Sequence, residues 1–137
     1  MKHYFLYFAA IYSIALVLLG VLFTMFNLGM ITTLPILIAA GFLTAAHFVK
    51  KEQRLPSNDE KMLLVWGTTM TALVIACILL FFYIVTNPAS DHLLEAAEKS
   101  GLAGTAVIML FVVIIHGGIF YLSYGWYANR CFNKLNQ

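Results

Sequence analysis

Among the residues whose side chains could do chemistry, His116 stands out. Its imidazole is ionisable, and it lies within an uncharged apolar stretch. An ionisable side chain inside a membrane segment is a functional hypothesis by default. At about 1.5 Å per helical residue it lies about 16 Å from the nearer end of that stretch, and Tyr12, Ser13 and Thr71 lie about 12 to 14 Å deep in two others. The four residues predict one polar layer. In it, His116 is either a neutral, hydrogen-bonded group or one that carries protons or contacts a ligand.

The other residues that could ligate a metal or attack a substrate are scattered. Two axial haem ligands need similar depths, but His47 lies only about 5 Å into its stretch and so differs from His116 by about 11 Å along the membrane normal. Cys77 and Cys131 show no C-x-x-C spacing. The serines inside the stretches have no G-x-S-x-G context, and no stretch contains a carboxylate for acid–base catalysis. We therefore expect no enzyme activity, no metal and no cofactor.

The elements that carry these residues are four long stretches without Asp, Glu, Lys or Arg. The 137 residues are 62% hydrophobic and only 10% charged, against about 25% charged in soluble domains. A helix needs about 20 apolar residues to cross a bilayer, and four stretches are long enough: roughly 4–26, 30–49, 62–86 and 102–127. The first is too long for the apolar region of a signal peptide, about 7–15 residues. The sequence predicts an all-α integral membrane bundle of four transmembrane helices in a single domain, with the lipid bilayer as its first partner.

The connections predict how these spans are joined. Asn27-Leu28-Gly29 is short and rich in turn-forming residues, so the first two spans are expected to form an antiparallel hairpin, and the last two a second one. In the polar loop 50–61, Ser57 and Glu60 have the S-x-x-E spacing of a capping box, in which each side chain bonds the other's backbone N–H. This spacing predicts the start of the third helix.

Positive charge is unequally divided between the two sides of the predicted bundle. Seven Lys and Arg residues belong to the termini and loop 50–61, whereas the other connections contribute only Lys99. The positive-inside rule then predicts that both termini are cytoplasmic and that the segment 87–101 is external. In that segment Ser90 would cap a short helix, which Gly101 would end or bend into the fourth span. The net charge of +2 is too small to suggest a nucleic-acid partner.

Small residues predict where the helices pack. Helices in lipid associate through small residues, close packing and a few hydrogen bonds. Ala40 and Gly41 in the second span, and Gly117, Gly118 and Gly125 in the fourth, permit close backbone approach. We expect them to form packing faces within the bundle, with a ligand groove as the alternative.

A wider pattern starts with Lys2-His3-Tyr4-Phe5-Leu6 and continues with Arg54-Leu55-Pro56-Ser57 and Glu60-Lys61 before Trp66. This pattern resembles a family of small four-helix inner-membrane proteins of proteobacteria. The resemblance implies a bacterial inner-membrane location and no assigned activity. Small multidrug transporters also have four spans, but the stretch 4–26 lacks their defining glutamate.

Two functions follow from these patterns. The small-residue faces and the lack of reactive groups favour an accessory or structural component that acts by helix packing, with itself as a homo-oligomer or with a larger membrane complex. The alternative is a small transporter or channel with a path along the polar layer around His116. Four helices enclose little room, so this alternative requires oligomerisation.

Overall fold

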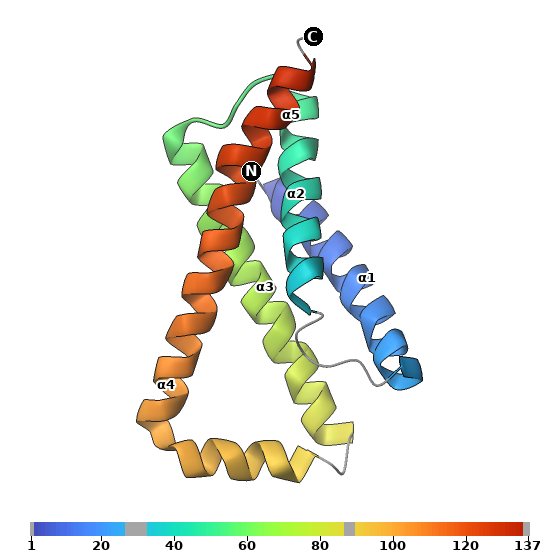
Figure 1. Ribbon diagram of the computed structural model, residues 1–137, viewed down its shortest axis with the longest axis vertical. Coiled ribbons are helices and arrows are strands. Elements are labelled where there is room, and N and C mark those ends of the chain that lie inside the picture. The colour runs from blue at the N-terminus through green and yellow to red at the C-terminus, as the bar shows by residue number, and fades with distance from the viewer. Residues whose placement is uncertain (1, 27–32, 87–89, 136–137) are drawn as a thin grey trace.

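The computed structural model describes residues 2–26, 33–86 and 90–135, and these are helical except for the loop 53–57 (Figure 1). Its helices are α1 (Lys2–Phe26), α2 (Thr33–Glu52), α3 (Asn58–Thr86), α4 (Asp91–Leu122), the π-helix η3 (Ser123–Tyr127) and α5 (Ala128–Leu135). Four helical stretches are long and apolar enough to cross a membrane, as predicted, and their length and composition indicate a multi-pass membrane protein. The turn predicted at Asn27-Leu28-Gly29 lies outside the described residues.

Helices α2 and α3 both extend beyond the predicted spans toward the polar loop. α2 starts with Pro35 in its first turn, where the missing N–H of proline costs no intrahelical hydrogen bond. It continues through Lys50 and Lys51 in its last turn, where cations suit the negative end of the helix dipole. α3 starts at Asn58, with Asp59 and Glu60 near the positive end of its dipole.

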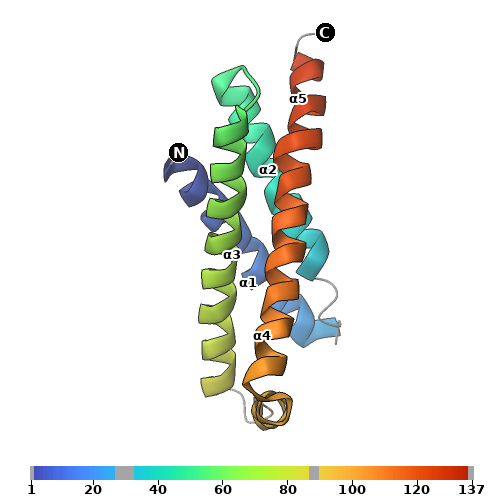
Figure 2. The same cartoon turned by 90° about the vertical axis from the view of Figure 1, so that its left-hand side faces the viewer.

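Helix α4 changes direction at Gly101. Its φ of 66° and ψ of 176° belong to a region that only glycine adopts readily. The part before the bend runs across one end of the molecule, and the part after it runs beside α3 (Figures 1 and 2). Gly101 therefore bends the chain into the fourth span. The predicted cap is wrong, because the Ser90 hydroxyl donates to the Ile84 carbonyl at 3.0 Å and makes no cap bond.

The buried core lies in the half of the molecule nearest the polar loop. There α1 packs against α2 and α3, and α2 packs against η3 and α5. The core side chains are Tyr4, Phe8, Tyr12, Leu37, Ala40, Ala45, Phe48, Val49, Leu64, Val65, Ala72, Phe120, Tyr124 and Ala128. In contrast, no residue of 73–86 or 102–119 is buried. The later part of α3 and the earlier part of the fourth span, which lie away from the polar loop, are thus much less packed than the parts near that loop.

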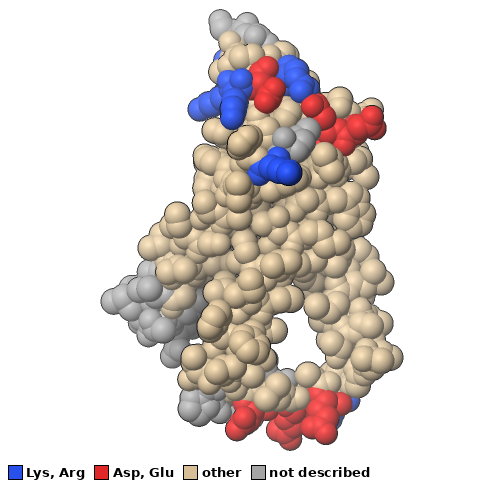
Figure 3. Space-filling view, turned by 180° about the vertical axis from the view of Figure 1, so that it is seen from behind, with Lys and Arg blue, Asp and Glu red and all other residues tan. Residues whose placement is uncertain are grey.

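Charge is segregated along the molecule. Figure 3 shows the Lys and Arg side chains of that view gathered mainly at the end with the polar loop, beside some acidic side chains, and a second group of acidic side chains at the opposite end. The band between them carries no charged side chain in this view, which matches the predicted spans. The same view shows an opening through the molecule beside the acidic end, where α3 and α4 stand apart.

Close helix contact depends on two glycines. A Cβ at Gly41 of α2 would lie 2.8 Å from Ser123 Oγ and 3.1 Å from a ring carbon of Phe120, and Ala40 beside it is buried. A Cβ at Gly67 of α3 would overlap the Phe5 ring of α1. The packing predicted for Ala40 and Gly41 is therefore present. Gly67 is a contact that the sequence analysis missed.

The π-helix η3 interrupts the fourth span near its end. Its wide turn buries Ser123 and Tyr124, and the Ser123 hydroxyl donates to the Ile119 carbonyl at 2.8 Å. The chain then continues as α5 to Leu135. The sequence analysis missed both the π turn and the continuation, because the apolar pattern stops at Tyr127 while the helix does not.

Candidate functional site

The structure does not assemble the predicted polar layer into one hydrogen-bonded group. His116 Nδ1 lies 2.8 Å from the Val112 carbonyl, which only accepts, so this nitrogen carries the proton. The Thr71 hydroxyl donates to the Gly67 carbonyl at 2.7 Å. Both bonds stay within one helix, and no hydrogen bond joins the four predicted residues in the described part of the chain.

The other two members of the predicted layer lie in apolar surroundings. Tyr12 is buried, and its ring stacks on Phe8 with 5.4 Å between centroids. Ser13 faces a small apolar cavity between α1 and α3, together with Val17 and Ile75. A shared depth therefore did not bring these side chains to one place.

A second candidate is a groove between α3 and α4 with a volume of about 350 Å³. Its lining surface is almost entirely apolar, and its residues are Met62, Val65, Trp66, Thr69, Val113, Ile114, Gly117, Gly118 and Tyr121. The Lys61 ammonium lies 4.7 Å from the centroid of the Tyr121 ring, so a cation stands at the end of the groove nearest the polar loop.

The glycines of the fourth span lie open rather than packed. A Cβ added at Gly117, Gly118 or Gly125 would meet no atom within 4 Å in the described chain. These three glycines therefore do not pack closely against another described helix of this chain. Gly117 and Gly118 instead form part of the groove between α3 and α4, and Gly125 lies in the π-helix η3.

The groove contains an unpaired hydroxyl. Thr69 is only 1% exposed, and its Oγ1 has no hydrogen-bond partner among the residues described. Its neighbour Thr68 donates to the Leu64 carbonyl at 2.7 Å, as threonines in helices commonly do. A buried polar group without a partner costs free energy. Thr69 is thus the residue of the groove with an unmet hydrogen bond, and it was not among the predicted site residues.

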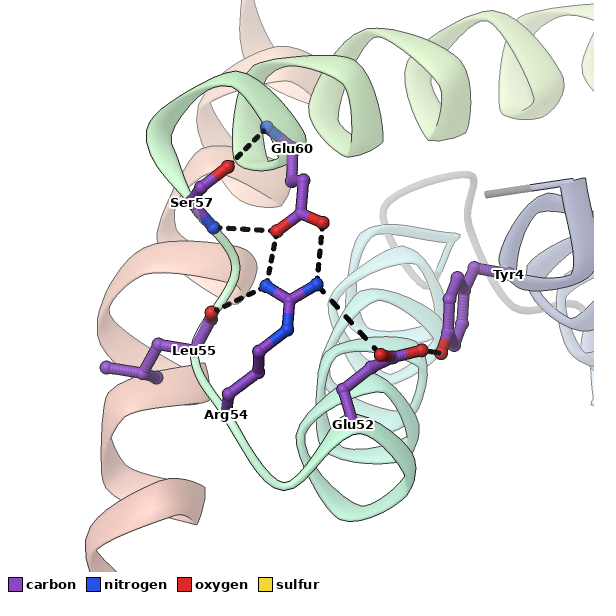
Figure 4. A network of polar contacts seen from close by, with 6 residues as sticks. All are labelled: Tyr4, Glu52, Arg54, Leu55, Ser57 and Glu60. Atoms are coloured by element: carbon purple, nitrogen blue, oxygen red, sulfur yellow. Dashed lines mark hydrogen bonds and ion pairs between the residues drawn. The ribbon is translucent and has the colours of Figure 1, made fainter.

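The polar loop contains a network centred on Arg54 (Figure 4). Arg54 binds both carboxylate oxygens of Glu60, at 2.6 and 2.7 Å. Both bonds of the predicted capping box are present, from the Ser57 N–H to Glu60 at 2.9 Å and from the Glu60 N–H to the Ser57 hydroxyl at 3.2 Å. Arg54 also lies 3.9 Å from Glu52, whose carboxylate accepts a hydrogen bond from the Tyr4 hydroxyl. The network links α1, α2 and the start of α3.

The electrostatics of this network keep its central pair ionised. Glu60 lies in the first turn of α3, before the apolar stretch that begins at Met62. Hydrogen bonds from Arg54 and from Ser57 lower the pKa of Glu60 to about 2. The carboxylate therefore stays charged at neutral and mildly acidic pH, and the arrangement is suited to fixing the loop rather than to transferring protons.

Neither candidate offers an arrangement typical of catalysis. Within the ranges that the structure describes, no three His, Cys, Asp or Glu side chains gather as metal ligands. The groove offers an apolar surface beside the unpaired hydroxyl of Thr69, and the loop network offers a fixed set of paired charges. Comparison with protein-family models, with curated proteins and with solved structures found no match to this chain.

Proposed function

We propose that this chain is a non-catalytic accessory or structural protein of the membrane, which binds a transmembrane helix in the groove between α3 and α4. The helix belongs to a second copy or to a larger membrane complex. The observation that carries the proposal is the combination of two open glycines, Gly117 and Gly118, with the unpaired hydroxyl of Thr69 in one apolar groove.

The physics of helix association in lipid supports a helix as the occupant. Apolar burial drives little association there, because lipid tails are as apolar as leucine side chains. Close approach over small residues and hydrogen bonds between helices contribute instead. Gly117 and Gly118 permit the first, and Thr69 can donate the second. A lipid acyl chain could fill the same groove, but it has no acceptor for the hydroxyl.

The alternative of transport along the His116 layer receives no support from the geometry. A proton path needs polar groups within hydrogen-bond reach of each other, directly or through water. His116 and Thr71 each bond to a carbonyl of their own helix, and Ser13 faces an apolar cavity.

The proposal includes a membrane location and a topology. The excess of Lys and Arg at the termini and loop 50–61 supports cytoplasmic termini, with α1 and α2 as one hairpin and α3 and α4 as the second. The bacterial inner membrane is proposed on the sequence resemblance alone.

The test compares two glycine-to-leucine variants of the tagged full-length chain. Gly117→Leu fills the groove, whereas Gly20→Leu places the same side chain on α1, where an added Cβ also meets no atom within 4 Å. After extraction from native membranes in mild detergent, native mass spectrometry identifies the chains that co-purify. We expect a stoichiometric helix-bearing partner or second copy. Gly117→Leu should reduce that complex by on the order of tenfold, about 1.4 kcal/mol.

Gly20→Leu should leave the complex intact, since it does not touch the groove. A chain that purifies as a monomer without a stoichiometric partner would contradict the proposal. An equal loss in both variants would also contradict it, because the groove would then not be the contact.

A further inference from the structure

A second cavity lies between α2, η3 and α5, at the end of the fourth span, and the proposed helix packing does not use it. Its volume is about 340 Å³. One group of lining residues is aromatic, namely Phe42, Trp126 and Tyr127, and is called here the aromatic wall. The other residues are Arg130, Cys131 and Lys134 of α5. Two cations therefore line the same cavity as three aromatic side chains.

The aromatic wall is held by contacts between elements far apart in the sequence. The rings of Phe42 and Tyr127 stack with 4.1 Å between centroids and 5° between their planes. The Arg130 guanidinium lies 4.5 Å from the centroid of the Trp126 ring. Trp126, Arg130 and Lys134 follow each other at helical spacing of four, so they share one face.

The two cations lack acidic partners within the described ranges. The ion pairs found there belong to Arg54, and neither Arg130 nor Lys134 takes part in one. Both side chains are exposed. By contrast, Lys61 lies over the Tyr121 ring and Lys51 lies over the Tyr4 ring, at 4.7 and 5.7 Å from their centroids, away from this cavity.

The cavity extends from the apolar band to the membrane interface. Phe42 lies about 12 Å before Lys50 along α2, hence within the apolar band. Arg130 and Lys134 lie beyond Trp126 and Tyr127, which are residue types that anchor at the membrane interface. One ligand that fits both ends carries an anionic group and a hydrocarbon chain. Basic pockets between membrane helices near the interface suit lipid headgroups of this kind.

We propose that Arg130 and Lys134 bind the phosphate of an anionic glycerophospholipid in this cavity. Arginine is suited to the role because its planar guanidinium can donate two parallel hydrogen bonds to one phosphate. An acyl chain of the same lipid lies against the aromatic wall. A free inorganic anion would use only the cations and leave the aromatic wall without a ligand.

The test uses Trp126 as an internal reporter. The chain has two tryptophans, so Trp66→Phe leaves Trp126, which lines the cavity and is 54% exposed, as the single emitter. The full-length variant is reconstituted into phosphatidylcholine vesicles containing either brominated phosphatidylglycerol or brominated phosphatidylcholine at the same mole fraction. We expect the anionic brominated lipid to quench Trp126 more strongly at every mole fraction.

Charge-matched variants then locate the effect. Arg130→Gln with Lys134→Gln should lower the preference for the anionic lipid by about fivefold per cation removed. Lys51→Gln with Lys61→Gln removes the same charge outside the cavity and should leave the preference unchanged. Arg130→Lys with Lys134→Arg keeps both cations and should also leave it largely unchanged, which controls for misfolding.

Three results would overturn the proposal. The first is equal quenching of Trp126 by the two brominated lipids in the Trp66→Phe protein, before any cation is replaced. An equal loss of preference in the two Gln pairs would show that surface charge, not the cavity, attracts the lipid. Abolition of the preference by inorganic phosphate, but not by chloride at the same ionic strength, would assign the cations to a soluble anion.

Discussion

At the scale of single residues, Thr68 and Thr69 show how one position along a helix changes the role of the same side chain. Both are buried in α3. The hydroxyl of Thr68 is bonded to the Leu64 carbonyl of its own helix, whereas that of Thr69 has no partner in the described chain and lies in the groove. Only the second hydroxyl has a hydrogen bond left to make within the described chain, and it is buried beside the groove.

This difference yields a prediction for two valine substitutions, each of which removes a hydroxyl with little change in shape. Thr69→Val should weaken the complex with the partner helix by about threefold, since interhelical hydrogen bonds in membranes average about 0.6 kcal/mol. Thr68→Val should leave the complex unchanged, because its hydroxyl bonds within α3. The measurement is the concentration dependence of complex formation in lipid bilayers, by fluorescence energy transfer. A stronger effect at Thr68 than at Thr69 would assign the contact to another face.

At the scale of elements, the fourth span depends on one backbone conformation. The segment 91–100 and the rest of α4 meet at Gly101, whose positive φ allows the sharp change of direction. The segment carries Asp91, Glu95 and Glu98, whose charges keep it out of the apolar band. The bend therefore separates an acidic surface helix from an apolar span without an intervening loop.

Gly101→Ala should destabilise the protein by about 1 to 3 kcal/mol, the usual cost of placing a non-glycine residue in this backbone region. The matched control is Gly104→Ala, three residues later in the same helix, where the new Cβ would lie 3.3 Å from the Ser100 Cβ; this tight contact offsets the higher helix propensity of alanine, about 1 kcal/mol, so stability should change little. Unfolding of the detergent-solubilised chain in denaturant, followed by circular dichroism, measures both changes. A Gly101→Ala variant as stable as the Gly104→Ala variant would mean that the bend is not required.

At the scale of the whole molecule, charge and packing divide the protein into two ends. The end with the polar loop carries the core and the network around Arg54. The opposite end carries the acidic segment, and the helices leading to it have no buried residue in 73–86 or 102–119. A partner helix in the groove between α3 and α4 would therefore pack close to this core, whereas the helix faces toward the acidic end are open along their length.

The charge division also predicts the topology. A reporter enzyme that is active only after export should be active when fused after residue 95 and inactive when fused after residue 56, because Lys and Arg concentrate on the loop side. A reporter that works only in the cytoplasm should give the reverse pattern at the two positions. If both reporters gave the opposite result, the proposed orientation would be wrong.

Some features of this protein follow from local sequence alone. The four apolar spans are set by stretch length and by the absence of charge, and the start of α3 is set by Ser57 and Glu60. The bend at Gly101 was one of two outcomes expected there. These properties depend on neighbouring residues and on the thickness of a bilayer, so one sequence suffices to predict them.

Other features were decided by the tertiary structure. Depth along a helix can be counted from sequence, but the direction of a side chain depends on how the helix is rotated and on which helix faces it. For this reason His116, Tyr12, Ser13 and Thr71 share a depth without meeting, and Gly117 and Gly118 lie open instead of packed. The second cavity lies where Phe42 of α2 stacks on Tyr127 of η3. This contact requires helices from distant parts of the chain to be in place.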